Sequence, residues 1–302
     1  MTLPNFLVIG VAKAGTTALY EALKQHSQIY MSPIKEPRFF TFVDSPLALS
    51  GPGAARYCAT AITELGTYQR LFAGVTNQIA VGEASQDYLS CWYPERTADN
   101  IKKLIPTAKL IAILRQPAER AYSSFAHQVQ IGNEQERDFR QMLIAAARPE
   151  RRQWLSYRCK NDGFYYANLK PYFDQFSREQ LRIYLYEDWN TKPQQVLTDI
   201  FRFLGVEERI KPTMTQRQNE TTWVRNQTLA DLLQPSHPIQ RGLARLLTPT
   251  ARKRVVTPLK GWNQTKPPPL DQQLRHELTA MYRDDILQLQ ELIGRDLSHW
   301  LV

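Results

Sequence analysis

NFLVIGVAKAGTTALYEAL, residues 5 to 23, sets the architecture of this chain. Asn5 to Gly10 form a short apolar run without alternation, which predicts a central parallel strand covered on both faces. The small residues 11–15 suit neither a helix nor a strand, and Thr16 opens a segment with apolar residues at helical spacing. A strand, a glycine loop and a helix N-terminus in this order predict an anion site, because loop amides and the helix dipole both favour negative charge.

The loop carries part of a nucleotide-binding motif. Gly10 and Gly15 have the spacing of the two glycines in a P-loop, and Thr17 stands at its Ser/Thr position. Thr16 replaces the P-loop lysine, while a lysine stands inside the loop at Lys13. The stretch therefore predicts a phosphate site whose cation approaches from an unusual direction. The alternative is a tight strand-to-helix turn with a solvated lysine.

Composition limits the classes of function. The 302 residues carry a formal charge of +9, which favours anionic ligands such as nucleotides, sulfated molecules or nucleic acid. The cysteines are odd in number and widely spaced, which indicates neither a disulfide framework nor a metal site: Cys58, Cys91 and Cys159. We find no signal peptide and no apolar run of about 18 residues. A cytoplasmic protein that does not enter a membrane is expected.

Further apolar runs predict an α/β fold. Short strands are expected at residues 28–31, 79–82, 108–114 and 181–186. Helices are expected at residues 61–72, 98–105, 117–130, 164–176, 193–204 and 270–292. Loops are expected at residues 43–60 and 211–226, a variable, mobile segment at 133–160, and a Pro- and Arg-rich segment at 235–270. With no repeat and no clear linker, we predict one domain over residues 1–302, with a parallel sheet flanked by helices on both faces.

SPIKEPRFFTF, residues 32 to 42, presents a candidate base. Pro33 and Pro37 force an extended path around Glu36, which lies between Lys35 and Arg38. A carboxylate fixed in this way can act as a general base. The commoner alternative is a surface ion pair.

Two polar residues follow the expected strand at residues 79–82. Glu83 and Ser85 stand where parallel sheets bind ligands, at the carboxyl end of a strand. We take both as candidate substrate contacts. The alternative is a loop in which Ser85 serves as a helix N-cap.

The strand at residues 108–114 ends in a second candidate anion site. Arg115 follows that strand, and Ser123 lies on the second turn of the helix that Pro117 opens. Both side chains can reach one phosphate, the guanidinium in bidentate fashion and the hydroxyl by one hydrogen bond. The alternative pairs Arg115 with Glu119 and leaves the serine in a helix groove.

Four stretches together resemble the sulfotransferases that use 3′-phosphoadenosine-5′-phosphosulfate (PAPS), in the branch of glycosaminoglycan sulfotransferases and soluble bacterial enzymes. They are GVAKAGTTAL, KEPRFF, ILRQPAERAYSSF and the closing segment PLDQQLRHEL to GRDLSHW. The resemblance runs almost from end to end, and the first and third stretches, each after a strand, are highly specific. It implies a P-loop-kinase-like fold and PAPS as co-substrate, with adenosine 3′,5′-bisphosphate (PAP) as product.

The resemblance also implies roles for individual residues. The first loop would bind the 5′-phosphate through Lys13, Ala14, Gly15, Thr16, Thr17 and Ala18, with Lys13 also contacting the leaving oxygen. Arg115 and Ser123 would hold the 3′-phosphate, and Glu36 would be the catalytic glutamate. Arg38 stands where relatives carry a histidine or another polar residue, so it is a candidate substrate contact. Arg225 is the candidate for a late loop that closes over the co-substrate in relatives.

The expected reaction is transfer of a sulfuryl group from PAPS to a hydroxyl or amine of a small molecule or carbohydrate, without a metal. Some glycan-modifying relatives have a lysine where this chain has Ala84, which argues against a heparan-type acceptor. A metal-dependent small-molecule kinase is the main alternative, although Thr16 and Arg115 stand where it needs lysine and aspartate. A nucleic-acid-binding module agrees with the charge but lacks a recognisable motif. The sequence predicts neither the acceptor nor the oligomeric state.

Overall fold

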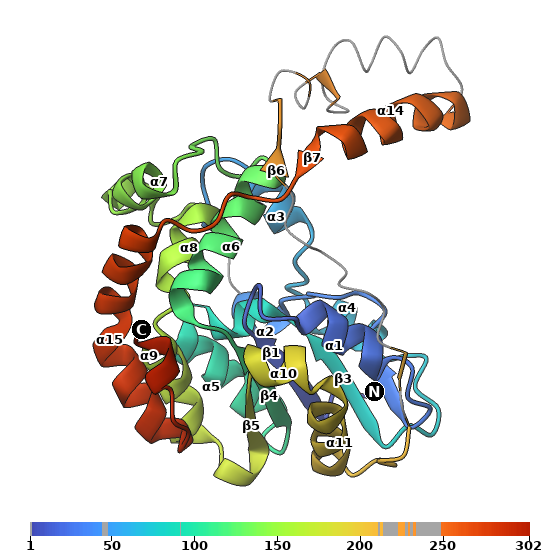
Figure 1. Cartoon of the computed structure of the whole chain (residues 1–302). Helices are drawn as coiled ribbons and strands as arrows, with labels where there is room; N and C mark the ends of the chain where they lie inside the picture. The colour runs from blue at the N-terminus through green and yellow to red at the C-terminus, as the bar shows by residue number, and fades with distance from the viewer. Residues whose placement is uncertain are drawn as a thin grey trace.

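A five-stranded parallel sheet forms the centre of the protein in this computed structural model (Figure 1). The structure describes residues 2–43, 48–90, 92–210, 212–213, 223–226, 229, 232–233 and 249–302. The strands are β1 (Phe6–Gly10), β2 (Ile29–Met31), β3 (Ala80–Ala84), β4 (Lys109–Leu114) and β5 (Leu181–Leu185), in the order β2-β3-β1-β4-β5. The predicted α/β fold with a single parallel sheet is confirmed.

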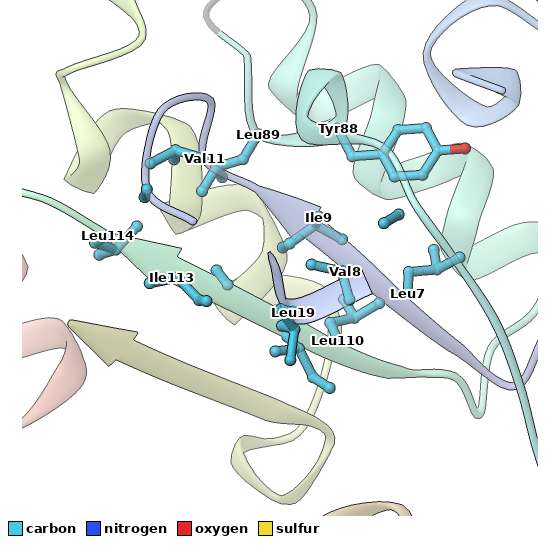
Figure 2. Packing of buried hydrophobic residues seen from close by; sticks show 14 of the residues in the cluster. Leu7, Val8, Ile9, Val11, Leu19, Tyr88, Leu89, Leu110, Ile113 and Leu114 are labelled. Carbon is cyan, nitrogen blue, oxygen red and sulfur yellow. The ribbon is translucent and has the colours of Figure 1, made fainter. Parts of the chain in front are cut away.

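The two most apolar runs of the sequence occupy the middle of the sheet. Phe6 to Gly10 are all buried, and β1 pairs with β3 on one side and with β4 on the other. Leu7, Val8 and Leu110 lie in one packed cluster, which Leu19 joins from the first helix (Figure 2). A strand in this position has no solvent face, so it needs apolar residues at every position rather than alternation.

Helices cover both faces of the sheet, with α1 and α11 on one side and α5, α9 and α15 on the other (Figure 1). The main helices are α1 (Thr16–Leu23), α5 (Pro94–Leu104), α6 (Pro117–Gln130), α9 (Tyr165–Gln175), α11 (Pro193–Leu204) and α15 (Gln272–Ile293). Each overlaps a predicted helix. The bounds of α11 agree with the prediction because local signals fix both ends: Pro193 opens the helix and Gly205 ends it with φ 79°.

Short elements complete the fold. They are α2 (Phe39–Phe42), α3 (Ala54–Ala59), α4 (Leu65–Arg70), α7 (Phe139–Ala146), α8 (Arg158–Asn161), α10 (Tyr186–Thr191) and the 3-10 turns η1 (Gln86–Leu89), η2 (Pro149–Arg151), η3 (Leu155–Tyr157), η4 (Arg178–Gln180) and η5 (Ser298–Trp300). Helix α3 lies in the segment 43–60 that we expected as loop, and α4 is shorter than the predicted helix 61–72. Residues 43–60 are rich in Pro and Gly, which indicated a loop and gave no signal for the short helix α3.

Residues 133–160 differ most from expectation. We expected a variable, mobile segment from their arginine content, but the structure contains α7, η2, η3 and the start of α8 there. Met142, Leu155 and Cys159 are buried, while Arg151 pairs with Glu134 at 3.3 Å. Burial raises the pKa of the Cys159 thiol to about 12. Buried apolar residues dock this segment, and two of its arginines, Arg140 and Arg151, pair with carboxylates distant in the sequence.

The C-terminal part carries a small two-stranded ribbon. Strands β6 (Trp223–Val224) and β7 (Gln264–Thr265) pair in antiparallel fashion, and helix α14 (Pro249–Asn263) extends from this ribbon away from the sheet (Figure 1). The segment 235–270, for which the sequence indicated only a Pro- and Arg-rich composition, contains α14, and its residues 235–248 lie outside the described part. Within the described residues, no helix combines the length and the apolar character needed to cross a membrane.

Candidate active site

The loop between β1 and α1 has the backbone of an anion site. Gly15 precedes α1 in the left-handed region with φ 92°, and Lys13 is also left-handed with φ 70°. A Cβ at Gly15 would lie 2.7 Å from the indole of Trp189 on α10, so only glycine fits. The tight turn brings the first amides of α1, beginning at Thr16, to the carboxyl edge of the sheet.

A cavity of about 920 Å³ opens above this loop. Its walls come from the loop, the end of β4, α6, α10 and the segment after β2. It brings together most of the residues that the sequence proposed for the site: Lys13, Gly15, Thr16, Thr17, Ala18, Glu36, Arg115 and Ser123. Ala14 is fully buried under the loop and does not line the cavity.

Lys13 and Arg115 form the positive end of the cavity. Nη1 of Arg115 donates to the carbonyl oxygen of Lys13 at 3.2 Å, and the guanidinium lies 4.9 Å from the ring centre of Tyr186. Burial and, next, the positive charge of Arg115 lower the pKa of Lys13 to about 8. Two cations at one end of a cavity favour an anionic ligand, because a negative charge relieves their repulsion.

The sequence left two alternatives open for Arg115, and the structure contains features of both. Nη2 of Arg115 lies 3.9 Å from Oε2 of Glu119, which is four residues later in the sequence and in the first turn of α6. Both residues nevertheless line the cavity, together with Ser123 on the same helix. A loose pair with 23% of the arginine side chain exposed leaves the guanidinium available to a phosphate.

Glu36 reaches the cavity from a constrained backbone. Its φ is 63°, its N–H donates to the carbonyl oxygen of Ala84 at 2.9 Å, and its carboxylate accepts from Lys35 Nζ at 2.6 Å. Gln86 Nε2 lies 3.4 Å from the other carboxylate oxygen. The side chain is 23% exposed, so the carboxylate is both held and accessible.

Three proposed substrate contacts lie behind Glu36 instead of in the cavity wall. Arg38 is buried, and its guanidinium donates to the carbonyl oxygens of Glu36 and Tyr57 and pairs with Asp87 at 3.4 Å. Glu83 and Ser85 are fully buried as well. The structure therefore gives these residues protein partners, and their contact with a substrate stays a prediction without geometric support.

Arg225 also lies apart from the other site residues. It is exposed at the end of β6, and its N–H donates to the carbonyl oxygen of Asn263 at 2.8 Å. Lys266 and Pro267, which follow the partner strand β7, line the cavity. The run KPPP at residues 266–269 was a usable signal, because a cation on a stiff extended backbone is well placed to face a ligand.

The sequence reading also missed His127. It lines the cavity from α6, four residues after Ser123, a spacing that puts both side chains on one helix face. Burial and then the charge of Lys13 lower its pKa to about 4, so the imidazole is neutral at pH 7. Tyr186 and Trp189 add an aromatic wall from α10.

Comparison with known proteins agrees with this geometry. A family model described as "Sulfotransferase domain" matches residues 3–234. The bifunctional heparan sulfate N-deacetylase/N-sulfotransferase 4 of Mus musculus is 27% identical over 308 residues, which cover 99% of this chain but only 31% of that relative. Carbohydrate sulfotransferase 15 of Mus musculus is 28% identical over 68% of this chain and 44% of its own length.

Among solved structures, a sulfotransferase from Alicyclobacillus acidocaldarius superposes with a TM-score of 0.75 and 32% identity, covering 99% of both chains. The family model alone matches well over half of the sequence. Together with the sheet, the glycine loop and the cavity, these matches show that this chain belongs to the sulfotransferase domain family.

Proposed function

We propose that this chain transfers a sulfuryl group from PAPS to a hydroxyl or amine of a carbohydrate or small molecule and releases PAP. One observation carries the proposal: a single cavity joins an anion-binding loop, a second cationic site and an accessible carboxylate. Neither cation site alone would distinguish a bisphosphate nucleotide from other anions. Two cationic groups that line one cavity, Lys13 on the loop and Arg115 at the end of β4, match a nucleotide that carries a phosphate on both its 3′ and 5′ sides.

The 5′-phosphate would lie at the N-terminus of α1, held by the amides of the loop and by Lys13. The 3′-phosphate would lie between Arg115 and Ser123 at the end of β4. Lys266, next to β7, adds a further cation to the cavity wall. The adenine ring has an aromatic wall available in Tyr186 and Trp189.

In the proposed reaction, Glu36 accepts the proton of the acceptor O–H or N–H group while the acceptor atom attacks sulfur. The new O–S or N–S bond forms in line with the breaking bond between sulfur and the 5′-phosphate oxygen. Negative charge then develops on that oxygen, and Lys13 with the α1 amides stabilises it. Lys13 has a pKa of about 8 and so is mostly charged at pH 7.

The proposal includes no metal ion. A sulfuryl group carries less charge than a phosphoryl group, and Thr16 and Arg115 occupy the positions where a kinase of this fold needs lysine and a metal-binding aspartate. Among the described side chains, no three His, Cys, Asp or Glu residues cluster in a way that would hold a metal ion. Magnesium-dependent use of ATP would favour the kinase alternative.

The relatives favour a carbohydrate acceptor, since heparan sulfate and carbohydrate sulfotransferases stand among them. The prediction of one domain over residues 1–302 is supported by the mutual 99% coverage with the Alicyclobacillus structure. Cys58 and Cys159 are free thiols, which suits the reducing cytoplasm that we propose as the location.

The first experiment measures thermal stability with PAP, with ADP, and with ATP plus magnesium. A ligand that binds only the native state raises the melting temperature, so PAP alone should stabilise the protein. Stabilisation by ATP and magnesium without any effect of PAP would overturn the proposal.

The second experiment follows transfer of sulfur-35 from labelled PAPS to a free-amino glucosamine oligosaccharide, a hydroxyl-only oligosaccharide and a phenol. On the acceptor that is labelled, Glu36→Gln should lower turnover on the order of 10²–10⁴-fold, the usual worth of a general base. Its PAP stabilisation should stay unchanged. Glu21→Gln, an exposed carboxylate on α1, is the matched control. Near-normal turnover of Glu36→Gln would exclude Glu36 as the base.

A further inference from the structure

A buried carboxylate lies behind Glu36, and the proposed reaction does not use it. Glu83, near the end of β3, is fully buried and accepts hydrogen bonds from three hydroxyl groups. Tyr68 on α4 donates to Oε1 at 3.2 Å, Tyr88 on η1 donates to the same oxygen, and Ser85 Oγ donates to Oε2 at 2.9 Å. Burying a carboxylate is costly, and here three hydroxyl donors surround one, so packing alone does not explain the group.

Ser85 connects this carboxylate to the loop that carries Glu36. The N–H of Arg38 donates to Ser85 Oγ at 3.0 Å, and the N–H of Glu36 donates to the carbonyl oxygen of Ala84 at 2.9 Å. The end of β3 therefore holds the backbone on both sides of Pro37. Nε of Arg38 also donates to the carbonyl oxygen of Glu36 at 3.1 Å, which closes the loop on itself.

The loop that carries Glu36 depends on these hydrogen bonds because two of its residues have an unfavourable backbone conformation. Glu36 and Arg38 both have positive φ, 63° and 58°, a region that residues other than glycine rarely adopt. Such conformations persist only where surrounding contacts fix them. Without the two hydrogen bonds to β3, both residues would relax, and the Glu36 carboxylate would leave its place in the cavity.

We propose that Glu83 is a positioning residue, which orients Ser85 so that the Arg38 amide, and with it the Glu36 loop, is fixed for catalysis. A serine hydroxyl has one hydrogen; when that hydrogen is donated to Glu83, only lone pairs remain to face Arg38. The ionised carboxylate thus sets the direction of both hydrogen bonds. The catalytic role of Glu83 rests on the proposed function of Glu36. The fixing of the loop conformation by Glu83 and Ser85 does not.

The arrangement predicts a dependence on pH. Burial raises the pKa of Glu83 to about 7, although the three hydroxyls and the charge of Lys35 act in the opposite direction. The groups that face the carboxyl are Tyr68 from α4, Tyr88 from η1, Ser85 from the end of β3 and Lys35 from the loop itself. A proton on Glu83 gives the site a fourth hydroxyl donor, so the Ser85 hydroxyl loses its fixed direction below pH 7.

Amide hydrogen exchange, resolved by NMR on deuterated protein, tests the hold without an acceptor. In Ser85→Ala, the Arg38 amide should exchange about tenfold faster than in the parent, since a lost hydrogen bond of this kind is worth about one decade. Tyr68→Phe is the matched control, because it removes one hydrogen bond to Glu83 on the oxygen that Ser85 does not use. Measured at pH 8, where the Glu83 carboxyl is mostly ionised, its Arg38 amide should stay within about twofold of the parent.

Glu83→Gln provides a second, independent variant. The parent should lose protection at Arg38, corrected for intrinsic exchange, as the pH falls from 8 to 6, whereas Glu83→Gln should show a constant value. Unchanged exchange in Ser85→Ala, or the same pH dependence in parent and Glu83→Gln, would overturn the proposal.

Turnover separates this proposal from that for Glu36. On the acceptor labelled with sulfur-35, Ser85→Ala and Glu83→Gln should lower kcat about tenfold or more and leave PAP affinity unchanged, while Tyr68→Phe should retain the parent kcat. If Glu36→Gln keeps its turnover but the Arg38 amide of Ser85→Ala exchanges faster, Glu36 is not the base, while the proposal that Ser85 fixes the loop is retained. If Glu36→Gln is inactive and Ser85→Ala has normal kcat, the positioning role fails by itself.

Discussion

Unlike most acidic residues, Glu83 should make the folded protein less stable as the pH rises. Glu83→Gln should remove this contribution to the pH dependence of stability. The parent carboxyl has a pKa of about 7 in the folded protein, against 4.5 for an ordinary glutamate in the unfolded chain. Between these two values the unfolded chain has released its proton and the folded protein has kept it. Rising pH therefore favours unfolding of the parent over this window, whereas glutamine does not titrate.

The size of the effect follows from the two pKa values. Each pH unit between them corresponds to about 1.4 kcal/mol, so the parent should lose about 3 kcal/mol of unfolding free energy relative to Glu83→Gln between pH 4.5 and 8. This loss is the energetic cost of keeping an ionised carboxylate in the core. It is large against the 5–15 kcal/mol that typical domains have in total.

Urea unfolding of both proteins in the same buffers, followed by tryptophan fluorescence, measures this difference. Every other titrating group is shared by the two proteins, so its contribution cancels when the unfolding free energies are subtracted at each pH. The difference should grow with pH in favour of the glutamine variant and level off above pH 7. A difference that stays constant from pH 4.5 to 8 would refute the reasoning, because it would mean that Glu83 titrates alike in both states.

Three further predictions concern the co-substrate site. Arg115→Ala should weaken PAP binding roughly 10- to 100-fold in calorimetry, the worth of a charge-assisted hydrogen bond, and unchanged affinity would remove Arg115 from the 3′-phosphate site. Because the pKa of Lys13 is about 8, PAP binding at pH 8 should take up about half a proton as the phosphate recharges the amine, so the binding enthalpy should vary with the ionisation enthalpy of the buffer. An enthalpy independent of buffer would contradict a phosphate at Lys13. Gly15→Ala should cost on the order of 1–3 kcal/mol of stability, since its φ is 92° and its new methyl group would meet Trp189, and a melting temperature equal to that of the parent would refute this contact.

Short sequence patterns predicted those strands and helices whose formation depends mainly on residues close together in the sequence. The strand at Phe6–Gly10 and the helix that begins at Thr16 follow from an apolar run, a glycine and a helical repeat within a few residues. The prediction of an anion site rests on the same short stretch, so it needs no information from the rest of the chain. The position of Arg115 followed in the same way from the end of an apolar strand.

Contacts between distant residues were beyond the reach of the sequence. Arg38 looked like a substrate contact, but Asp87 pairs with it in the core, and nothing in the local sequence indicates that partner. Lys266 enters the cavity because β7 pairs with β6, and two strands of two residues each leave almost no periodic signal. Arg225, on that ribbon, was selected instead. The sequence thus indicated candidate polar residues, but not the distant partners that decide which of them line the cavity.

Because Cys159 is buried, the rate at which a reagent labels its thiol reports how often the surrounding part of the core opens. A thiol with a pKa of about 12 is almost entirely protonated at pH 8, and it has no access to an alkylating reagent while α8 stays packed. Cys58, which is partly exposed, reports the speed of the reagent in the same sample. The labelling rate of Cys159, read by mass spectrometry of its peptide, therefore measures how often this part of the core separates. Helix α8 packs against α6, the helix that carries Ser123. The labelling rate of Cys159 would therefore show whether a bound nucleotide slows the opening of this part of the core.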